Sequence, residues 1–102
     1  ELMRRDYAKP LRIDQVASDS GQSLRQLQRH FQSVFGLSPQ EFLIKTRINA
    51  AARLLEETVL SASEIAHQCG FVDPSSFTQL FRKRMRVTPG GYRKKLESAP
   101  RV

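Results

Sequence analysis

The sequence carries one pattern twice, and this repeat limits the folds that the chain can adopt. The pattern Val-Ala-x-x-x-Gly at residues 16–21 returns as Ile-Ala-x-x-x-Gly at residues 65–70. The correspondence continues at an offset of fifty through Leu27 and Phe77, Phe31 and Phe81, Phe35 and Met85, Leu37 and Val87, Ser38 and Thr88, Pro39 and Pro89, and Phe42 and Tyr92. A short apolar helix, a glycine turn and a second amphipathic helix make a helix-turn-helix. The repeat therefore predicts two such units on one chain.

Apolar periodicity and helix-capping signals predict an all-α chain of about seven helices, without convincing strand alternation. The helices are expected at residues 1–8, 13–19, 23–35, 39–58, 61–68, 73–84 and from residue 88 onward. The longest helix has about nineteen residues, which at 1.5 Å each give a rod of roughly 28 Å. We expect a first helix-turn-helix subdomain at residues 1–38, a linker helix at 39–58 and a second subdomain at 59–102.

The apolar side chains that share one face of each longer helix are expected to form the core. These side chains belong to Leu24, Leu27, Phe31, Val34 and Phe35, to Ile44, Ile48, Ala51, Leu55 and Val59, and to Phe77, Leu80, Phe81 and Met85. One position differs between the two copies, because Arg86 stands where Gly36 ends the first amphipathic helix. Either Arg86 adopts a left-handed backbone at a cost of about 1 kcal/mol, or its helix ends with a different cap.

Composition favours a polyanionic partner, although solubility alone can also account for the charge. The chain has 17 Lys and Arg against 10 Asp and Glu, a net charge of +7 over 102 residues. The lone Cys69 excludes an intramolecular disulfide and is natural in a reducing compartment. Neither a membrane-spanning apolar run nor a secretory signal is present, so we expect a cytoplasmic protein. The first residue, Glu1, suggests a piece of a longer protein, though processing could produce the same start.

Subtracting the apolar faces leaves a polar outer face on each second helix of the two units. These faces carry Arg25, Gln28, Arg29 and Gln32 in the first unit and Ser75, Thr78, Gln79 and Arg82 in the second. All eight side chains can form hydrogen bonds and none is acidic, whereas an ordinary solvated face would mix in Glu and Lys. Arginine suits the paired acceptors of guanine, glutamine suits adenine, and Ser or Thr suits base edges or phosphate. The two faces are therefore candidate readers of double-stranded DNA.

Residues for catalysis or for metal binding are missing from the sequence. His30 and His67 are far apart, and Cys69 has no second cysteine with which to complete a thiolate metal site. We interpret both histidines as buried or half-buried structural residues and Cys69 as a small packing residue beside a turn. The prediction is a protein that is not an enzyme and needs neither a metal nor a cofactor.

The chain resembles the DNA-binding domain of the AraC/XylS family of bacterial transcription regulators. The similarity covers residues 11–94, and its most specific part is the second unit. There the motif consists of Gly70, Phe71, Phe77, Phe81, Arg82, Thr88, Pro89, Tyr92 and Arg93. The first unit contributes Val16, Ala17, Ser23, Leu27, Arg29, Phe31, Gly36, Ser38 and Pro39. One such unit is weak support, but the pair with its connecting helix is strong.

The resemblance implies two helix-turn-helix subdomains that insert their second helices into successive major grooves of one asymmetric site. Major-groove faces recur every ~34 Å, which a rod of roughly 28 Å with its end contacts can match. The family's base-reading positions fall on Arg25, Gln28, Arg29, Ser75, Thr78 and Gln79. DNA-backbone contacts are expected near the helix starts at Ser23, Ser38, Ser61, Asp73 and Thr88, aided by Lys45, Arg47, Arg82 and Lys83. Arg47 could instead pair with an acid inside the fold.

The resemblance also implies a further effector-binding or dimerisation domain in the full-length protein, contact with RNA polymerase, and a role as activator. Two alternatives remain open at this point. A helical protein-interaction module would bind a partner through its amphipathic faces and Phe71, and it requires an exposed apolar patch. Non-specific RNA or nucleoid binding would require aromatic stacking platforms, whereas the phenylalanines fall at core-like spacing.

Overall fold

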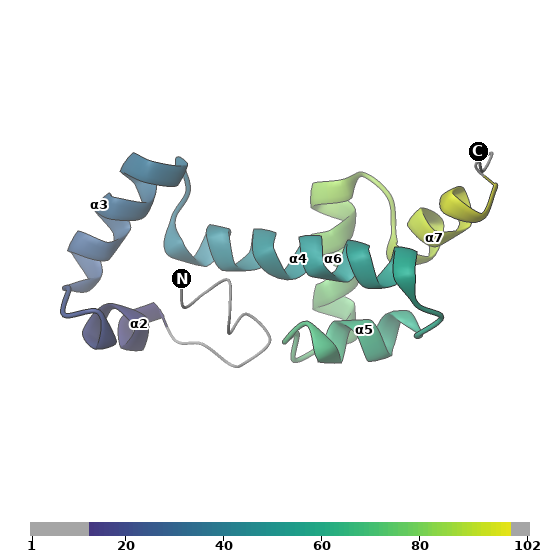
Figure 1. The fold of residues 1–102 in the computed structure, drawn as a ribbon, viewed down its shortest axis with the longest axis horizontal. Coiled ribbons are helices and arrows are strands. Elements are labelled where there is room, and N and C mark those ends of the chain that lie inside the picture. The colour runs from purple at the N-terminus through teal and green to yellow at the C-terminus, as the bar shows by residue number, and fades with distance from the viewer. Residues whose placement is uncertain (1–12, 99–102) are drawn as a thin grey trace. The chain divides into compact units, whose positions relative to one another are not determined.

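The computed structural model describes residues 13–98, which form six α-helices and no strand (Figure 1). The helices are α2 (Ile13–Asp19), α3 (Leu24–Phe35), α4 (Pro39–Glu57), α5 (Ala62–Gln68), α6 (Pro74–Met85) and α7 (Pro89–Ser98). The all-α prediction is confirmed. The helix expected at residues 1–8 lies outside the described residues. The chain divides into two compact units, residues 1–46 and 47–102, and the boundary falls within α4.

The first unit has an aromatic core at the junction of α3 and the start of α4. Its buried residues are Val16, Ala17, Leu27, Phe31, Phe42 and Leu43, with Phe35 packed against them. The ring centroids of Phe31 and Phe42 lie 5.3 Å apart, and those of Phe35 and Phe42 lie 4.6 Å apart. Helix α2 packs on α3, so the first helix-turn-helix is held by its own core.

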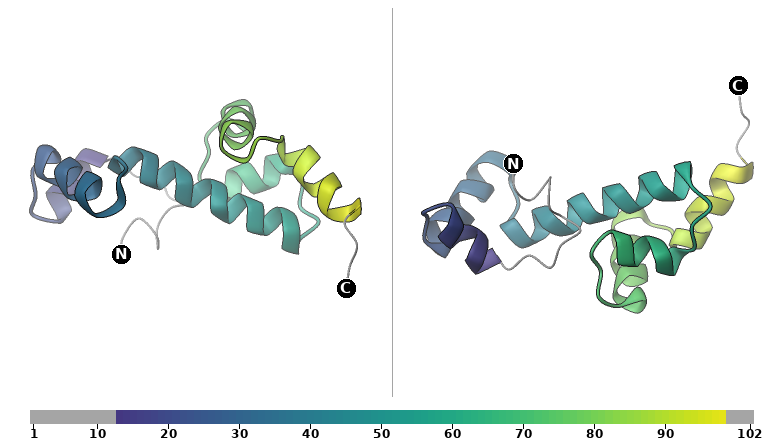
Figure 2. Two further views of the ribbon diagram at one scale, coloured as in Figure 1. Left: turned by 90° about the horizontal axis from the view of Figure 1, so that it is seen from above. Right: turned by 60° about the horizontal axis from the view of Figure 1, so that its bottom comes forward.

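In the second unit α5, α6 and α7 gather around the C-terminal part of α4 (Figure 2). Its buried apolar residues are Ile48, Ala51, Ala52, Leu55, Ile65, Ala66, Cys69, Phe71, Phe77 and Phe81. Phe77 and Phe81 are fully buried, and their centroids lie 5.7 Å apart. Phe81 also meets Tyr92 of α7 edge-on at 5.6 Å. This aromatic row links α6 to α7.

The helix starts lie where the sequence predicts them, because each capping side chain is present. Ser23, Ser38 and Ser61 each accept a hydrogen bond from the backbone N–H three residues later. The Gln or Glu at that third position accepts one in return from the serine N–H, which completes a capping box. Asp73 caps α6, and the Thr88 hydroxyl accepts from Gly91 N–H at the start of α7.

Both amphipathic helices end in a left-handed residue. Gly36 has φ 69° at the end of α3, and Arg86 has φ 67° at the end of α6. Of the two possibilities that the sequence leaves open at Arg86, the structure has the left-handed arginine. In each case the cap N–H donates to the carbonyl oxygen four residues earlier, Gln32 or Arg82. The two copies therefore have the same backbone conformation at this position but different residues.

Three side chains expected in the core are exposed. Leu24 and Val34 are 42% and 59% exposed, and they lie in the first and last turns of the twelve-residue α3. The packed α2 has only seven residues, about 10 Å against about 18 Å for α3, so it cannot cover both ends. Val59 is 99% exposed because α4 ends at Glu57 and leaves it in the following loop.

The interpretation of the two histidines as buried or half-buried was wrong. His30 on α3 and His67 on α5 are both exposed. Each stands directly beside a core residue, Phe31 or Ala66, and neighbours on a helix point about 100° apart, so the inward position is already taken. Cys69, in contrast, is fully buried as expected.

Candidate nucleic-acid interface

The outer face of α3 presents the four candidate readers of the first unit. Leu27 and Phe31 bury the inner face, and Arg25, Gln28, Arg29 and Gln32 are all exposed. Their i, i+3, i+4 and i+7 spacing on a regular helix places the four on one face. The α3 backbone is held by the Ser23 and Gln26 capping box at one end and by Gly36 at the other. Two guanidinium groups and two amides therefore share one solvent-facing side of a capped helix.

The outer face of α6 is chemically different. Ser75, Gln79 and Arg82 are exposed, whereas Thr78 is half-buried. The Thr78 hydroxyl donates to the Pro74 carbonyl oxygen at 2.9 Å, so it presents a methyl group and an acceptor oxygen. This face has one guanidinium group and shorter side chains than α3, and both faces lack acids.

The N-terminus of α6 is already capped by a carboxylate of the chain itself, that of Asp73. The Asp73 carboxylate accepts from the backbone N–H groups of Ser75 and Ser76 at 3.1 and 3.3 Å and from the Ser76 hydroxyl at 2.8 Å. The Ser76 hydroxyl bond and the Ser75 backbone bond lower the pKa of Asp73. A phosphate at this helix start would compete with an ionised carboxylate for the same amides.

The remaining residues expected near the DNA backbone fall into two groups. The side chains of Ser38, Ser61 and Thr88 accept hydrogen bonds from the first turns of α4, α5 and α7. Lys45 and Lys83 are exposed.

Arg47, also expected near the backbone, is half-buried against an aromatic ring. Its guanidinium carbon lies 5.9 Å from the Phe71 ring centroid, and burial lowers the pKa of this arginine. Phe71 is only 8% exposed, so it is not the accessible partner-binding residue that a protein-interaction module requires.

The environment of Cys69 makes a reactive thiol unfavourable. Cys69 is fully buried, and burial raises its pKa from 9.0 to about 11, with Arg47 acting in the opposite direction. We expect the folded protein to resist a disulfide-exchange reagent at about pH 8, and urea-unfolded protein to react at once, because the thiolate is the nucleophile. Rapid labelling of the folded protein would contradict the burial of Cys69.

The folded protein keeps the Cys69 thiol proton that the unfolded chain releases between pH 9.0 and about 11. Stability should therefore fall as the pH rises through that window.

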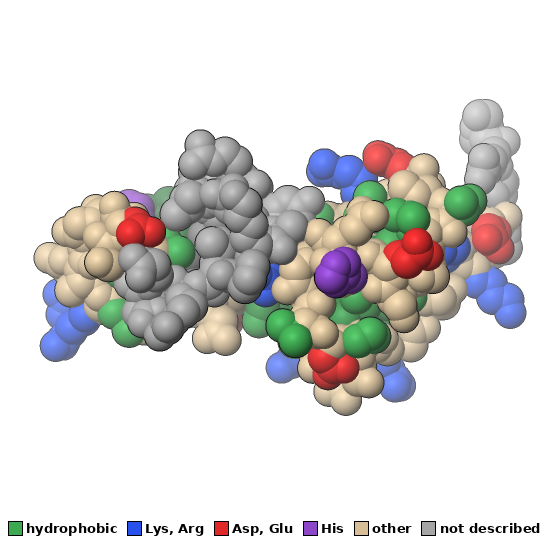
Figure 3. Space-filling view, turned by 90° about the horizontal axis from the view of Figure 1, so that it is seen from below, with side chains coloured by type: hydrophobic (Ala, Val, Ile, Leu, Met, Phe, Trp, Pro, Cys, Tyr) green, Lys and Arg blue, Asp and Glu red, His purple; other side chains and the backbone are tan. Residues whose placement is uncertain are grey.

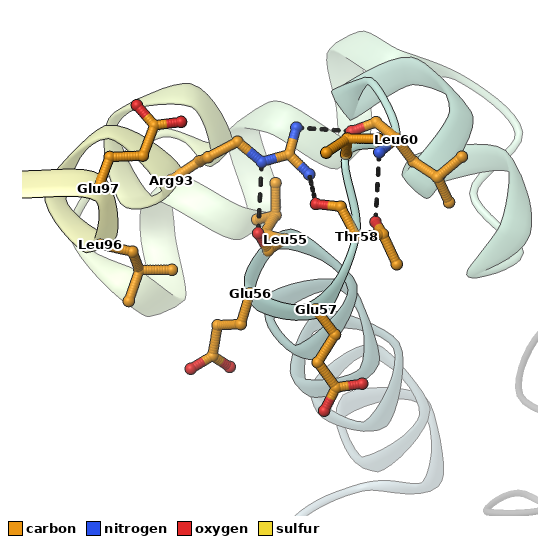
Figure 4. Close-up of a pocket in the computed structure, with 9 residues that line it drawn as sticks. Leu55, Glu56, Glu57, Thr58, Leu60, Arg93, Leu96 and Glu97 are labelled. Atoms are coloured by element: carbon orange, nitrogen blue, oxygen red, sulfur yellow. Dashed lines mark hydrogen bonds between the residues drawn. The ribbon is translucent and has the colours of Figure 1, made fainter. Parts of the chain in front are cut away.

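Arg93 holds the end of α4 to α7 through three backbone carbonyls (Figure 4). Its guanidinium donates to the carbonyl oxygens of Leu55 at 3.3 Å, Thr58 at 3.1 Å and Leu60 at 2.6 Å. These groups lie 33 to 38 residues away in sequence. They border a hollow of about 880 Å³ between the end of α4, its following loop and α7. Nothing in the local sequence marks these partners; only the family motif singles out Arg93.

Replacing Arg93 with alanine is expected to lower the free energy of unfolding by about 2 kcal/mol, because the carbonyl groups of Leu55 in α4 and of Thr58 and Leu60 in the following loop lose a charged donor. Arg93→Lys should recover only part of that loss, because an ammonium group cannot reproduce the planar fork. Urea denaturation followed by far-UV circular dichroism measures both. A lysine variant as stable as wild type would show that the fork geometry is unimportant.

The described residues contain no metal-binding cluster of three His, Cys, Asp or Glu side chains. None of the helices in this part of the chain is both long and apolar enough to cross a membrane.

Figure 3 shows hydrophobic side chains of the second unit in separate groups among polar ones. Phe31, Phe42, Phe77 and Phe81 are buried, so they cannot serve as stacking platforms for single-stranded RNA.

Comparison with known proteins identifies the family. Residues 6–95 match the family described as "Helix-turn-helix domain". A transcriptional regulator from Chromobacterium violaceum, described as an AraC-type DNA-binding domain-containing protein, is 31% identical, with a TM-score of 0.87 over 97% of this chain and 88% of its own. The chain belongs to the AraC/XylS family. The predicted resemblance is thereby confirmed.

Other AraC/XylS relatives show which kind of protein contains such a domain. The DNA-binding domain of AdpA, solved in complex with a target DNA, is 29% identical, with a TM-score of 0.90 over 93% of this chain and 86% of its own. The HTH-type transcriptional regulator GbdR of Pseudomonas aeruginosa is 34% identical over 86% of this chain. The HTH-type transcriptional activator RhaS of Escherichia coli is 36% identical over 81%. The chain spans 24% and 30% of the lengths of these two regulators. All three relatives are named as transcription factors or regulators.

Proposed function

We propose that this AraC/XylS chain is the sequence-specific, double-stranded-DNA-binding domain of a bacterial transcription regulator that works in the cytoplasm. The observation that carries the proposal is the pair of outer faces on α3 and α6. Together they hold eight side chains that can form hydrogen bonds, seven of them exposed and one half-buried, and none acidic. Capped, well-packed helices fix the backbone positions that carry these side chains before any ligand binds, so less backbone entropy is lost on binding.

In the proposed mode α3 and α6 each insert into a major groove, in two successive turns of one duplex. Arg25, Arg29 and Gln28 would read guanine and adenine edges in the first groove. Ser75, Thr78 and Gln79 would read the second groove. Gln32 lies on the α3 face and Arg82 on the α6 face. Because the two faces differ, the site should be asymmetric and bound by one chain. The relative AdpA, whose DNA-binding domain was solved in complex with a target DNA, supports DNA binding by this chain.

The full-length protein should carry further parts. The two curated regulators are several times longer than this chain, which supports a separate effector-binding or dimerisation domain. We propose activation, with contact to RNA polymerase, because one of these relatives is named as an activator.

The proposal is tested by selection from a pool of randomised duplexes at two salt concentrations, followed by sequencing of the retained DNA. We expect an asymmetric motif of two blocks about one helical turn apart, bound with a steep salt dependence. Salt-dependent binding without a motif would reduce the function to general DNA affinity. Absence of binding would overturn the proposal and favour a protein partner.

A further inference from the structure

The C-terminal end of α6 carries a concentration of positive charge that the matching end of α3 lacks. Arg82, Lys83 and Arg84 lie in the last turn of α6, and Arg86 follows as its cap. All four are exposed, and the structure pairs none of them with an acid among the residues that it describes. The last turn of α3 contains no basic residue, and its cap is Gly36. The two copies therefore differ in charge at the same structural position.

Arg86 is the member of this group that ordinary helix physics does not explain. Cations in a last helical turn offset the negative end of the helix dipole, which accounts for Arg82, Lys83 and Arg84. Arg86 lies beyond that turn with φ 67°, and among the described residues it is the sole non-glycine with a positive φ. At the equivalent position Gly36 has nearly the same angle, φ 69°, without steric cost. A strained arginine where glycine would fit indicates a role for its side chain.

The dimensions of α6 indicate what that side chain meets. Twelve residues give a helix of about 18 Å, whereas the major groove is about 12 Å wide. A helix that reads bases through its first turns must therefore pass the sugar-phosphate backbone with its last turn. The cations at that end are then well placed for phosphate oxygens, and an arginine can bind phosphate in bidentate fashion.

We propose that Arg86 is a DNA-phosphate contact and that the end of α6, through Arg82, Lys83, Arg84 and Arg86, anchors the second unit to the backbone. This assignment rests on the proposed function, to which it adds a division of labour between the units. The first unit, with Arg25 and Arg29 on its reading face and no basic residue in the last turn of α3, contributes base recognition. The second contributes backbone affinity that is largely independent of sequence.

The test compares Arg86→Gly with wild type by measuring duplex affinity as a function of salt concentration. Glycine relieves the left-handed strain, so we expect the urea midpoint of this variant to be no lower than that of wild type. Its plot of log affinity against log salt should lose about 0.9 from its slope, the contribution of one phosphate contact. Between 50 and 200 mM salt, the affinity ratio of wild type to variant should shrink about 3.5-fold. The same change is expected on the selected duplex and on an unrelated one.

Two further variants separate a specific contact from net charge. Arg86→Lys keeps the charge and should keep the wild-type slope. Arg53→Gln removes an exposed charge of α4 outside both reading faces and should also keep it. An unchanged slope in Arg86→Gly, or an equal loss in Arg53→Gln, would overturn the assignment. If wild type binds duplexes without a preferred motif, the proposed sequence specificity fails, yet a slope loss limited to Arg86→Gly still supports the contact. If wild type binds no duplex, both proposals fail.

Discussion

Replacing Phe81 with alanine is expected to destabilise the second unit by about 3 to 5 kcal/mol. The Phe81 side chain is fully buried, and its ring lies 5.7 Å from Phe77 and 5.6 Å from Tyr92 of α7. Truncation removes the ring that joins α6 to α7 and leaves a cavity that the surrounding helices cannot fully close. Small domains are stable by only about 5 to 15 kcal/mol, so the loss is a large share of the total. Urea denaturation of the purified chain, followed by far-UV circular dichroism, measures it.

The internal repeat supplies a matched variant for this experiment. Phe31 is the counterpart of Phe81 and is 5% exposed, with its ring 5.3 Å from Phe42. Phe31→Ala should cost a similar amount in the first unit. Val59→Ala is the neutral control, because a side chain that is 99% exposed should change stability by no more than about 0.5 kcal/mol. Equal midpoints for Phe81→Ala and Val59→Ala would show that the aromatic row does not hold α6.

Arg29→Ala is expected to weaken binding to the selected duplex by about 1 to 3 kcal/mol, roughly 5- to 150-fold, and to relax the preference at one or two base pairs of the first block. The reason is that a guanidinium group can bond the two acceptors of guanine at once, whereas the alanine side chain offers no donor. Repeated selection from the randomised pool with each variant identifies which base pairs lose their preference.

The comparison with Gln79→Ala decides which unit contributes more specificity. The α6 face carries Gln79 with Ser75, whose short hydroxyl adapts to several bases, and with Thr78, which offers a methyl group and an acceptor oxygen. We therefore expect a smaller loss from Gln79→Ala, confined to the second block. Affinity for an unrelated duplex is the control, and it should fall much less than affinity for the selected one. If Arg29→Ala left the motif unchanged while Gln79→Ala scrambled it, the order of the two readers would be reversed.

Helix starts could be predicted because their causes are local. Ser23, Ser38 and Ser61 each bond a backbone N–H only three residues away, and such a pattern is visible in any short stretch of sequence. The candidate reading faces were predictable for a related reason, because the spacing of Leu27 and Phe31 sets which face of α3 points inward and therefore which four polar residues point out.

Contacts between distant segments could not be predicted from periodicity. Arg93 finds its acceptors at Leu55, Thr58 and Leu60, 33 to 38 residues away. Val34 fits the apolar face of α3 but is exposed, because burial depends on the length of the helix that packs against it. The exposure of His30 and His67, in contrast, does follow from periodicity, since Phe31 and Ala66 occupy the inward positions of their helices.

The sequence by itself determined the repeat, the all-helical class, the bounds of α2 to α6 and the start of α7 to within one residue, and the absence of acids from both outer faces. These follow from interactions over three or four residues and from apolar periodicity. Only the tertiary structure decided that Arg86 takes the left-handed conformation, that Arg47 packs on Phe71 and that Arg93 joins α7 to the end of α4. For Arg47 and Arg93 the physical reason is that their partners lie far away in sequence, and no pattern within one helix specifies which distant groups the folded chain brings within contact distance. For Arg86 the sequence allows two different helix caps, and only the backbone of the folded chain decides between them.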